Sequence, residues 1–185
     1  MKENLGDTNA LYPLVTTLVG SVVDGKPDFA TVAHVGIAHL KGITLGMGKI
    51  HLTNEGIKAN REFSVSIPSV AMVEVTDYVG MASGKTIDKS GLFKVFYGEL
   101  KGAPLVDDCP VTMACRLIEH VELPTHDLFV GEIVETHADV DVLTNGVVDL
   151  AKVRPLLFDM ASKKYWSLGE PLAKCWSVGK GYSAP

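Results

Sequence analysis

The sequence lacks the signatures that mark metal, disulfide and hydrolase sites. It has only three cysteines, Cys109, Cys115 and Cys175, and none belongs to a C-x-x-C pair, so neither a zinc frame nor a disulfide framework is expected. Its six histidines form neither an H-E-x-x-H motif nor an i, i+4 pair, so we expect no metal ligands. No Ser-His-Asp or Cys-His set has a convincing context. Reduced thiols in a cytoplasmic protein are the expectation.

Charge and hydropathy argue against two further classes. Seventeen basic and 22 acidic residues give a net charge of −5 without long runs of one sign, so we expect no nucleic-acid partner. No apolar run approaches the roughly 20 residues that a membrane span needs. The opening MKENLGDTNALYP has no basic segment followed by an apolar one, so no signal peptide is expected. The chain is therefore predicted to have no membrane partner.

The sequence does contain enough apolar residues to form one hydrophobic core. The 185 residues are 46% hydrophobic, and neither a repeat nor a low-complexity linker divides them, so residues 1–185 are predicted as a single domain.

Strand patterns dominate this domain. Strands are predicted at 12–23, 29–38, 43–48, 63–69, 111–123, 127–140 and 156–160. DGKP joins the first two as a hairpin, and PTH joins the two long ones. A short helix is expected at 53–63 and a second at 70–81, although the β-branched content of the latter would also suit a strand. Because full βα units are missing, a closed antiparallel barrel is favoured over a doubly wound sheet.

Polar side chains gather where the strand at 43–48 meets the first helix. The segment GKIHLTNEGIKANREF places Lys49, His51, Thr53 and Asn54 within six positions. Thr53 and Asn54 are good N-cap residues, so capping alone would explain them. Alternatively, the free N–H groups of the helix start, with these donors, would bind an anion such as phosphate.

Two other polar segments have the same ambiguity. The loop SGKTIDK carries Ser83, Lys85 and Lys89, which suit either an anion or simple solvation. His126 lies in the hairpin turn PTHD, where it is either an exposed residue or a ligand contact that Asp127 orients.

The order of these motifs resembles the flavin reductase-like family, and within it the flavoredoxin group. The matching segments are YPLVTTLVGSVVDGKPDFATVAHVGIA, HLTNEGIKANREFSVSIPS, DYVGMASGKTIDK and CPVTMACRLIEHVELPTHDLFVGEIVETHAD. The resemblance covers about 10–172 and leaves 173–185 as a tail. It implies a mainly β, six-stranded antiparallel split β-barrel with short flanking helices. It also implies a homodimer, with FMN in a groove near the subunit interface.

The resemblance also implies site residues. KIHLT would hold the FMN phosphate, with Thr53 as first anchor and Asn54 as the cap. Lys89 would reach the flavin and His126 would sit beside the ring. The expected cofactor-binding residues are Asp28, Ala30, Thr31, Val32, Ala33, His34, Gly46, Met47, Gly48, Lys49, His51, Thr53, Asn54, Ser83, Gly84, Lys89, His126 and Phe158. No catalytic side chain is expected, because the flavin itself carries the redox chemistry.

Two positions depart from the family pattern. Asp28 stands where the family often has Asn, and His34 where it often has an aromatic residue. A carboxylate near the ring would disfavour the anionic reduced flavin, whereas a protonated imidazole would favour it.

The implied function is electron transfer through FMN, from NADH or NADPH to a flavin or a protein acceptor. The alternative is an FMN-binding electron carrier that does not use NAD(P)H directly. A third hypothesis is a split barrel that has lost its flavin.

Overall fold

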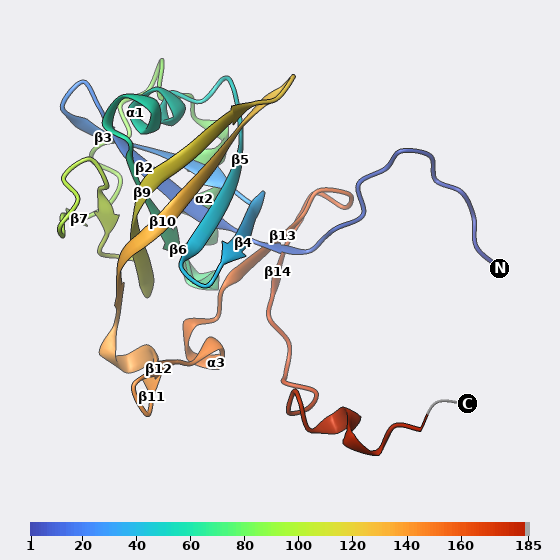
Figure 1. Cartoon of the computed structure of the whole chain (residues 1–185). Helices are drawn as coiled ribbons and strands as arrows, with labels where there is room; N and C mark the ends of the chain where they lie inside the picture. Colours follow the sequence, from blue (N-terminus) through green and yellow to red (C-terminus); the bar gives the residue numbers. More distant parts are fainter. Residues whose placement is uncertain (184–185) are drawn as a thin grey trace.

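One antiparallel sheet of seven strands forms the body of the molecule (Figure 1). The computed structural model describes residues 1–183, and the spatial order of the sheet is β3-β2-β6-β9-β10-β5-β4. The strands are β2 (Thr17–Val23), β3 (Lys26–Val32), β4 (Val35–His39), β5 (Gly42–Gly48), β6 (Glu62–Ile67), β9 (Val111–Glu122) and β10 (His126–Ala138). The predicted mainly β antiparallel architecture is confirmed, with seven strands in this sheet instead of six.

The sheet curls because its two edge strands are consecutive in the chain. Only Ala33 and His34 separate the end of β3 from the start of β4. A flat sheet with strands about 4.8 Å apart would hold its edges about 29 Å apart, which three backbone steps of at most ~3.6 Å cannot span. The Gly46 N–H donates to the His34 carbonyl at 2.8 Å, which fixes this connection against β5. The split of the barrel therefore lies at Ala33 and His34.

Alternating apolar residues fill the interior of the barrel. Leu45 on β5, Phe63 on β6 and Phe129 on β10 are fully buried in one cluster. Helix α1 (Thr53–Asn60) adds Ile57 to this cluster. It packs so closely on β2 that a Cβ added at Gly56 would lie 2.6 Å from the Val22 carbonyl oxygen.

The predicted helix at 70–81 is confirmed as the 3-10 turn η1 (Val70–Met72) followed by α2 (Val73–Met81). Helix α2 packs on β3, where the Thr31 hydroxyl donates to the Thr76 carbonyl at 2.6 Å. The position of α2 next to β3 brings it to the split of the barrel.

Smaller elements complete the fold. A three-stranded sheet contains β1 (Leu14–Val15), β13 (Leu156–Asp159) and β14 (Lys164–Ser167). The remaining elements are β7 (Val95–Phe96), β8 (Leu105–Val106), η2 (Val140–Val142), β11 (Leu143–Thr144), β12 (Val147–Val148), α3 (Leu150–Val153) and η3 (Val178–Gly181).

Three details differ from the sequence prediction. The strand predicted at 29–38 breaks at Ala33 and His34, because the chain there changes from one sheet edge to the other. His126 begins β10 and pairs with Gly48 instead of lying in the turn. Residues 164–167 form a strand that was not predicted.

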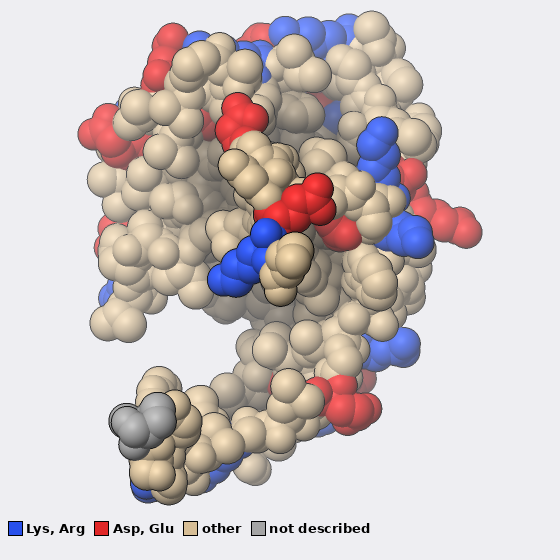
Figure 2. Space-filling view, turned by 90° about the vertical axis from the view of Figure 1, so that its right-hand side faces the viewer, with Lys and Arg blue, Asp and Glu red and all other residues tan. Residues whose placement is uncertain are grey.

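Both ends of the chain extend away from the barrel (Figure 1). We call the described residues after β14, 168–183, the C-terminal arm. Figure 2 shows this arm curving away from the body, with an open gap between them. Leu172 and Trp176 on this arm are 100% and 93% exposed. Within residues 1–183, no helix has the length and hydropathy to cross a membrane.

Candidate functional site

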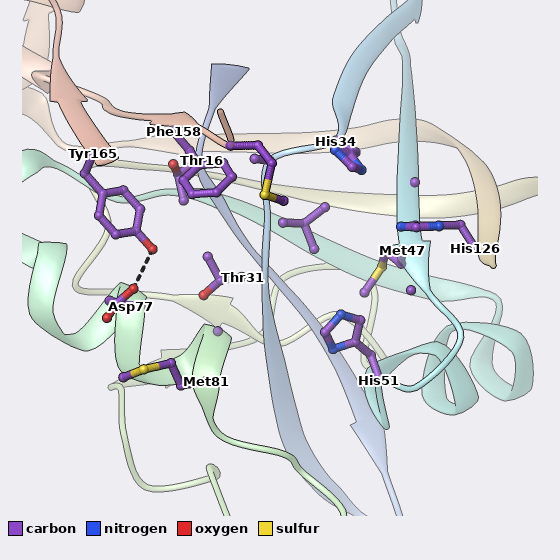
Figure 3. Close-up of a pocket in the computed structure, with 16 residues that line it drawn as sticks. Thr16, Thr31, His34, Met47, His51, Asp77, Met81, His126, Phe158 and Tyr165 are labelled. Atoms are coloured by element: carbon purple, nitrogen blue, oxygen red, sulfur yellow. Dashed lines mark hydrogen bonds between the residues drawn. The ribbon is translucent and has the colours of Figure 1, made fainter. Parts of the chain in front are cut away.

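A cleft of about 380 Å³ opens at the split of the barrel (Figure 3). Its size lies within the range of about 300–1,000 Å³ that is typical of ligand pockets. Ten predicted site residues line it: Thr31, Val32, Ala33, His34, Gly46, Met47, Gly48, His51, His126 and Phe158. Six further lining residues were not predicted: Thr16, Asp77, Gly80, Met81, Met160 and Tyr165.

Three histidines gather on one side of the cleft (Figure 3). The His34 and His126 rings lie 5.8 Å apart, and His34 Nε2 is 2.8 Å from the Tyr12 hydroxyl. Burial, with His126 nearby, lowers the pKa of His34. Burial, followed by the charge of Lys89, lowers the pKa of His51. His34 and His51 are therefore neutral at pH 7, so each ring can both donate and accept a hydrogen bond.

The other side of the cleft joins two segments that are distant in the sequence. The Tyr165 hydroxyl on β14 donates to Asp77 on α2 at 2.9 Å (Figure 3). Burial, with this Asp77 bond, raises the pKa of Tyr165 to about 12, so the phenol stays protonated. Phe158 on β13 packs against Tyr165 with ring centroids 5.7 Å apart. No sequence motif indicated the contact of Tyr165 with Asp77, because these two residues lie 88 positions apart.

Small residues leave backbone accessible in the cleft. A Cβ added at Gly46 would lie 3.3 Å from His34 Cβ, and one at Gly80 would lie 3.3 Å from Thr31 Cβ. The Thr16 hydroxyl is buried without a hydrogen-bond partner among the described residues. Buried hydroxyl groups usually have a hydrogen-bond partner, so the Thr16 hydroxyl favours a ligand with polar atoms at its edge. A flat ligand of this kind would fit between these surfaces.

A second cavity of about 390 Å³ continues along β3. Lys26, Pro27 and Asp28 line the second cavity, while Thr31 and Val32, further along the same strand, line the first. Likewise, Leu52 lines the second cavity, and its neighbour His51 lines the first cavity. We call the two cavities together the β3 trough. Among predicted site residues, Asp28, Gly84 and Lys89 line its second half.

A buried polar group lies at this second half of the trough. Asp28, Lys89 and Thr53 are 5%, 3% and 0% exposed. The Thr53 hydroxyl donates to Asp28 Oδ2 at 2.6 Å, and Lys89 Nζ lies 3.6 Å from Asp28 Oδ1. Burial lowers the pKa of Lys89, and Asp28 partly opposes this.

The capping interpretation of Thr53 and Asn54 is wrong. Leu52 occupies the N-cap position of α1, and no side chain caps it. Asn54 Nδ2 instead donates to the Gly48 carbonyl at 3.1 Å and to Asp127 Oδ2 at 2.9 Å. Both side chains are turned inward, because α1 packs on the barrel with its first turn buried.

Five predicted site residues line neither half of the β3 trough. Thr53 and Asn54 lie buried behind it, and Ala30 is part of the barrel core. Lys49 pairs with Glu122 at 3.5 Å at the surface. Ser83 accepts a hydrogen bond from the Lys85 N–H at 3.3 Å within its own loop.

The fold and trough define a split β-barrel with an elongated candidate ligand site. The chain belongs to the flavin reductase-like family, because residues 9–167 match the flavin reductase like domain. Flavoredoxin from Methanosarcina acetivorans is 38% identical, with a TM-score of 0.95 over 97% of this chain and 98% of that chain. Flavoredoxin of Desulfovibrio vulgaris (Miyazaki F) is 35% identical, with a TM-score of 0.90 over 97% and 100%.

Two further similarities extend this relationship. An uncharacterized protein of Archaeoglobus fulgidus is 33% identical over 134 residues, which cover 70% of this chain and 75% of that protein. An FMN-binding protein from Thermus thermophilus is 22% identical, with a TM-score of 0.78 over 94% of this chain and 97% of that one, and shows a shared fold.

Proposed function

We propose that this protein binds FMN in the β3 trough and passes electrons through it, from NAD(P)H to a flavin or protein acceptor. The observation that carries this proposal is the shape of the trough. One half is lined by glycines and by aromatic side chains, and the other half carries lysines beside the start of α1. FMN has a matching form, with a flat ring system at one end and a phosphate at the other. The flavoredoxins and the FMN-binding protein among the similar structures support the same cofactor.

The residues of the first half would hold the ring system. The backbone of Gly46–Gly48 and of Thr31–Ala33 would lie along its edge, where N–H and carbonyl groups can pair with polar ring atoms. His126 would position the ring, and Phe158 and Tyr165 would keep water from it. FMN held by these residues would supply the hydride and electron-transfer chemistry that no side chain of the cleft provides.

The residues of the second half would hold the phosphate. Lys85 and Lys89 supply positive charge, and the first turn of α1 supplies the positive end of a helix dipole.

The buried thiols take no part in this scheme. Burial raises the pKa of Cys115 to about 12, so it is not a thiolate at neutral pH. All three cysteines are unpaired, which fits a reducing compartment such as the cytoplasm.

The proposal is tested on the purified protein. It should be yellow, or become so with added FMN, and show the visible absorbance of a bound flavin. Anaerobic addition of NADH or NADPH should bleach this absorbance. If the colour persists with both donors, the protein is an FMN electron carrier that receives electrons from a protein partner. Protein that takes up no FMN would exclude both functions.

A further inference from the structure

We propose that Asp28 sets the affinity of this protein for the phosphate group of FMN. Its carboxylate already holds the donors that a phosphate would use, so it acts as an internal competitor. This inference rests on the proposed function, because it concerns the same ligand, and it assigns a specificity-determining residue within that site.

The donors near Asp28 are fully engaged. The one hydroxyl proton of Thr53 goes to Asp28 at 2.6 Å. The ammonium group of Lys89 has three protons, and it contacts the Phe29 carbonyl, the Ala82 carbonyl at 3.2 Å and Asp28 at 3.6 Å. A phosphate can therefore use these donors only in place of Asp28 or against its charge.

The other lysines of the second cavity are also paired. Lys26 lies 2.7 Å from Asp88, and Lys85 lies 3.2 Å from Glu55. These two pairs are exposed, so they are weak and rearrange at little cost. The Asp28–Lys89 pair differs, because both of its side chains are buried and its charges are weakly screened.

Asp28 is also held in place by its surroundings. Gly84 of the polar loop lies so close that an added Cβ would collide with the carboxylate. Lys89 and Thr53 hold its two oxygens. A phosphate dianion that enters the trough therefore meets a fixed negative charge, and this repulsion offsets part of its attraction to Lys89.

The substitution Asp28→Asn isolates this effect. Asparagine has the same size and keeps an oxygen that can accept from Thr53, but it has no charge. The positive charge of Lys89 is then available to the phosphate. We expect FMN to bind the variant about tenfold more tightly or better, since charge-assisted hydrogen bonds are strong. Riboflavin has the same ring without the phosphate, so its affinity should stay within about threefold.

The experiment titrates both flavins into the apo forms of the wild type and of Asp28→Asn, with flavin fluorescence as the signal. Asp88→Asn is the matched control, because it removes an exposed carboxylate from the same cavity. Equal changes for FMN and riboflavin, or the same gain in Asp88→Asn, would overturn the assignment. If neither protein binds any flavin, the proposed function and this inference fail together.

The wild type provides a second test that needs no variant. Two unopposed charge-assisted bonds to the phosphate would make the protein prefer FMN over riboflavin by about a hundredfold. Because repulsion from Asp28 offsets part of this attraction, the wild-type preference should be smaller than that. A larger preference would overturn the assignment even if Asp28→Asn does not fold. If it does fold, its apo form should melt at a lower temperature than the wild type, because Lys89 loses its buried partner.

Discussion

Asp127 is a buried carboxylate that ties α1 to the barrel. It accepts hydrogen bonds from Asn54 at 2.9 Å, from Lys58 at 2.9 Å and from His120 at 2.8 Å. Burial raises the pKa of Asp127, but bonds from Lys58, His120 and Asn54 prevail and lower it from 3.8 to about 2. The folded state thus binds this proton less readily than the unfolded state. The stability that results is fully present above pH 4 and is lost as the pH falls through 2.

The substitution Asp127→Asn should therefore destabilise the protein in a pH-dependent way. A pKa difference of this size corresponds to about 2 kcal/mol of unfolding free energy at pH 7. The difference from wild type should shrink between about pH 4 and pH 2, where the wild-type carboxylate takes up its proton. Urea unfolding at several pH values measures this. Asp141→Asn, at an exposed position, is the control that should have no such effect. A pH-independent loss would contradict the assigned role of the charge.

Lys89 is the buried positive charge of the β3 trough. The substitution Lys89→Ala removes it and leaves Asp28 without its ion-pair partner. FMN binding should weaken about tenfold or more, because a charge-assisted contact is lost and the repulsion from Asp28 is no longer balanced. Adding Thr53→Ala should weaken binding further, because Asp28 then also loses the hydrogen bond that offsets part of its negative charge. Lys85→Ala is the matched control, because this lysine of the same loop is half-exposed and should matter less. Fluorescence titration that gives equal affinities for Lys85→Ala and Lys89→Ala would contradict the larger role assigned to the buried charge of Lys89.

The β13–β14 hairpin covers one side of the cleft, and one hydrogen bond joins it to α2. Tyr165→Phe removes that bond to Asp77 and keeps the ring that packs against Phe158. Because such a bond contributes roughly 1 kcal/mol, FMN should dissociate about fivefold faster, with little change in its association. Stopped-flow recovery of flavin fluorescence on dilution gives the dissociation rate, and quenching on mixing flavin with the apo protein gives the association rate. Tyr182→Phe, on the exposed arm, is the control. An unchanged dissociation rate would show that the hairpin does not retain the cofactor.

The sequence predicted the elements of this cleft better than their contacts. Gly46, Met47 and Gly48 were expected from the family resemblance to bind the cofactor, and they line the cleft because alternating glycines in a strand leave its surface bare. The Tyr165–Asp77 bond was missed, because two residues 88 positions apart meet only through the tertiary fold. The inward direction of Thr53 was also missed. Helix periodicity places a residue on a face, but whether a hydroxyl caps the helix or meets Asp28 depends on how α1 packs.

At the scale of the whole molecule, the barrel has a packed core, whereas the two terminal segments carry large apolar side chains that the rest of the chain does not cover. Leu172, Trp176 and Tyr182 of the C-terminal arm are 100%, 93% and 80% exposed. Leu11 near the other end is 74% exposed. Monomeric proteins seldom leave so many large apolar side chains together in water, so a partner surface is expected to cover the arm. We propose that this surface belongs to a second copy of the chain in a homodimer.

The homodimer is tested by replacing the apolar residues of the arm. The full chain of 19.8 kDa should elute at about twice that mass in size-exclusion chromatography with light scattering, as a closed dimer would. Replacing Leu172, Trp176 and Tyr182 together with serine should weaken the dimer at least about tenfold, because large aromatic anchors dominate interface energies. The control replaces Lys174 and Lys180 of the same arm with serine, which removes two long side chains and leaves the apolar contacts. If both variants stay dimeric at low concentration, the arm is not the interface. If the unmodified chain is monomeric at micromolar concentration, the dimer itself is excluded.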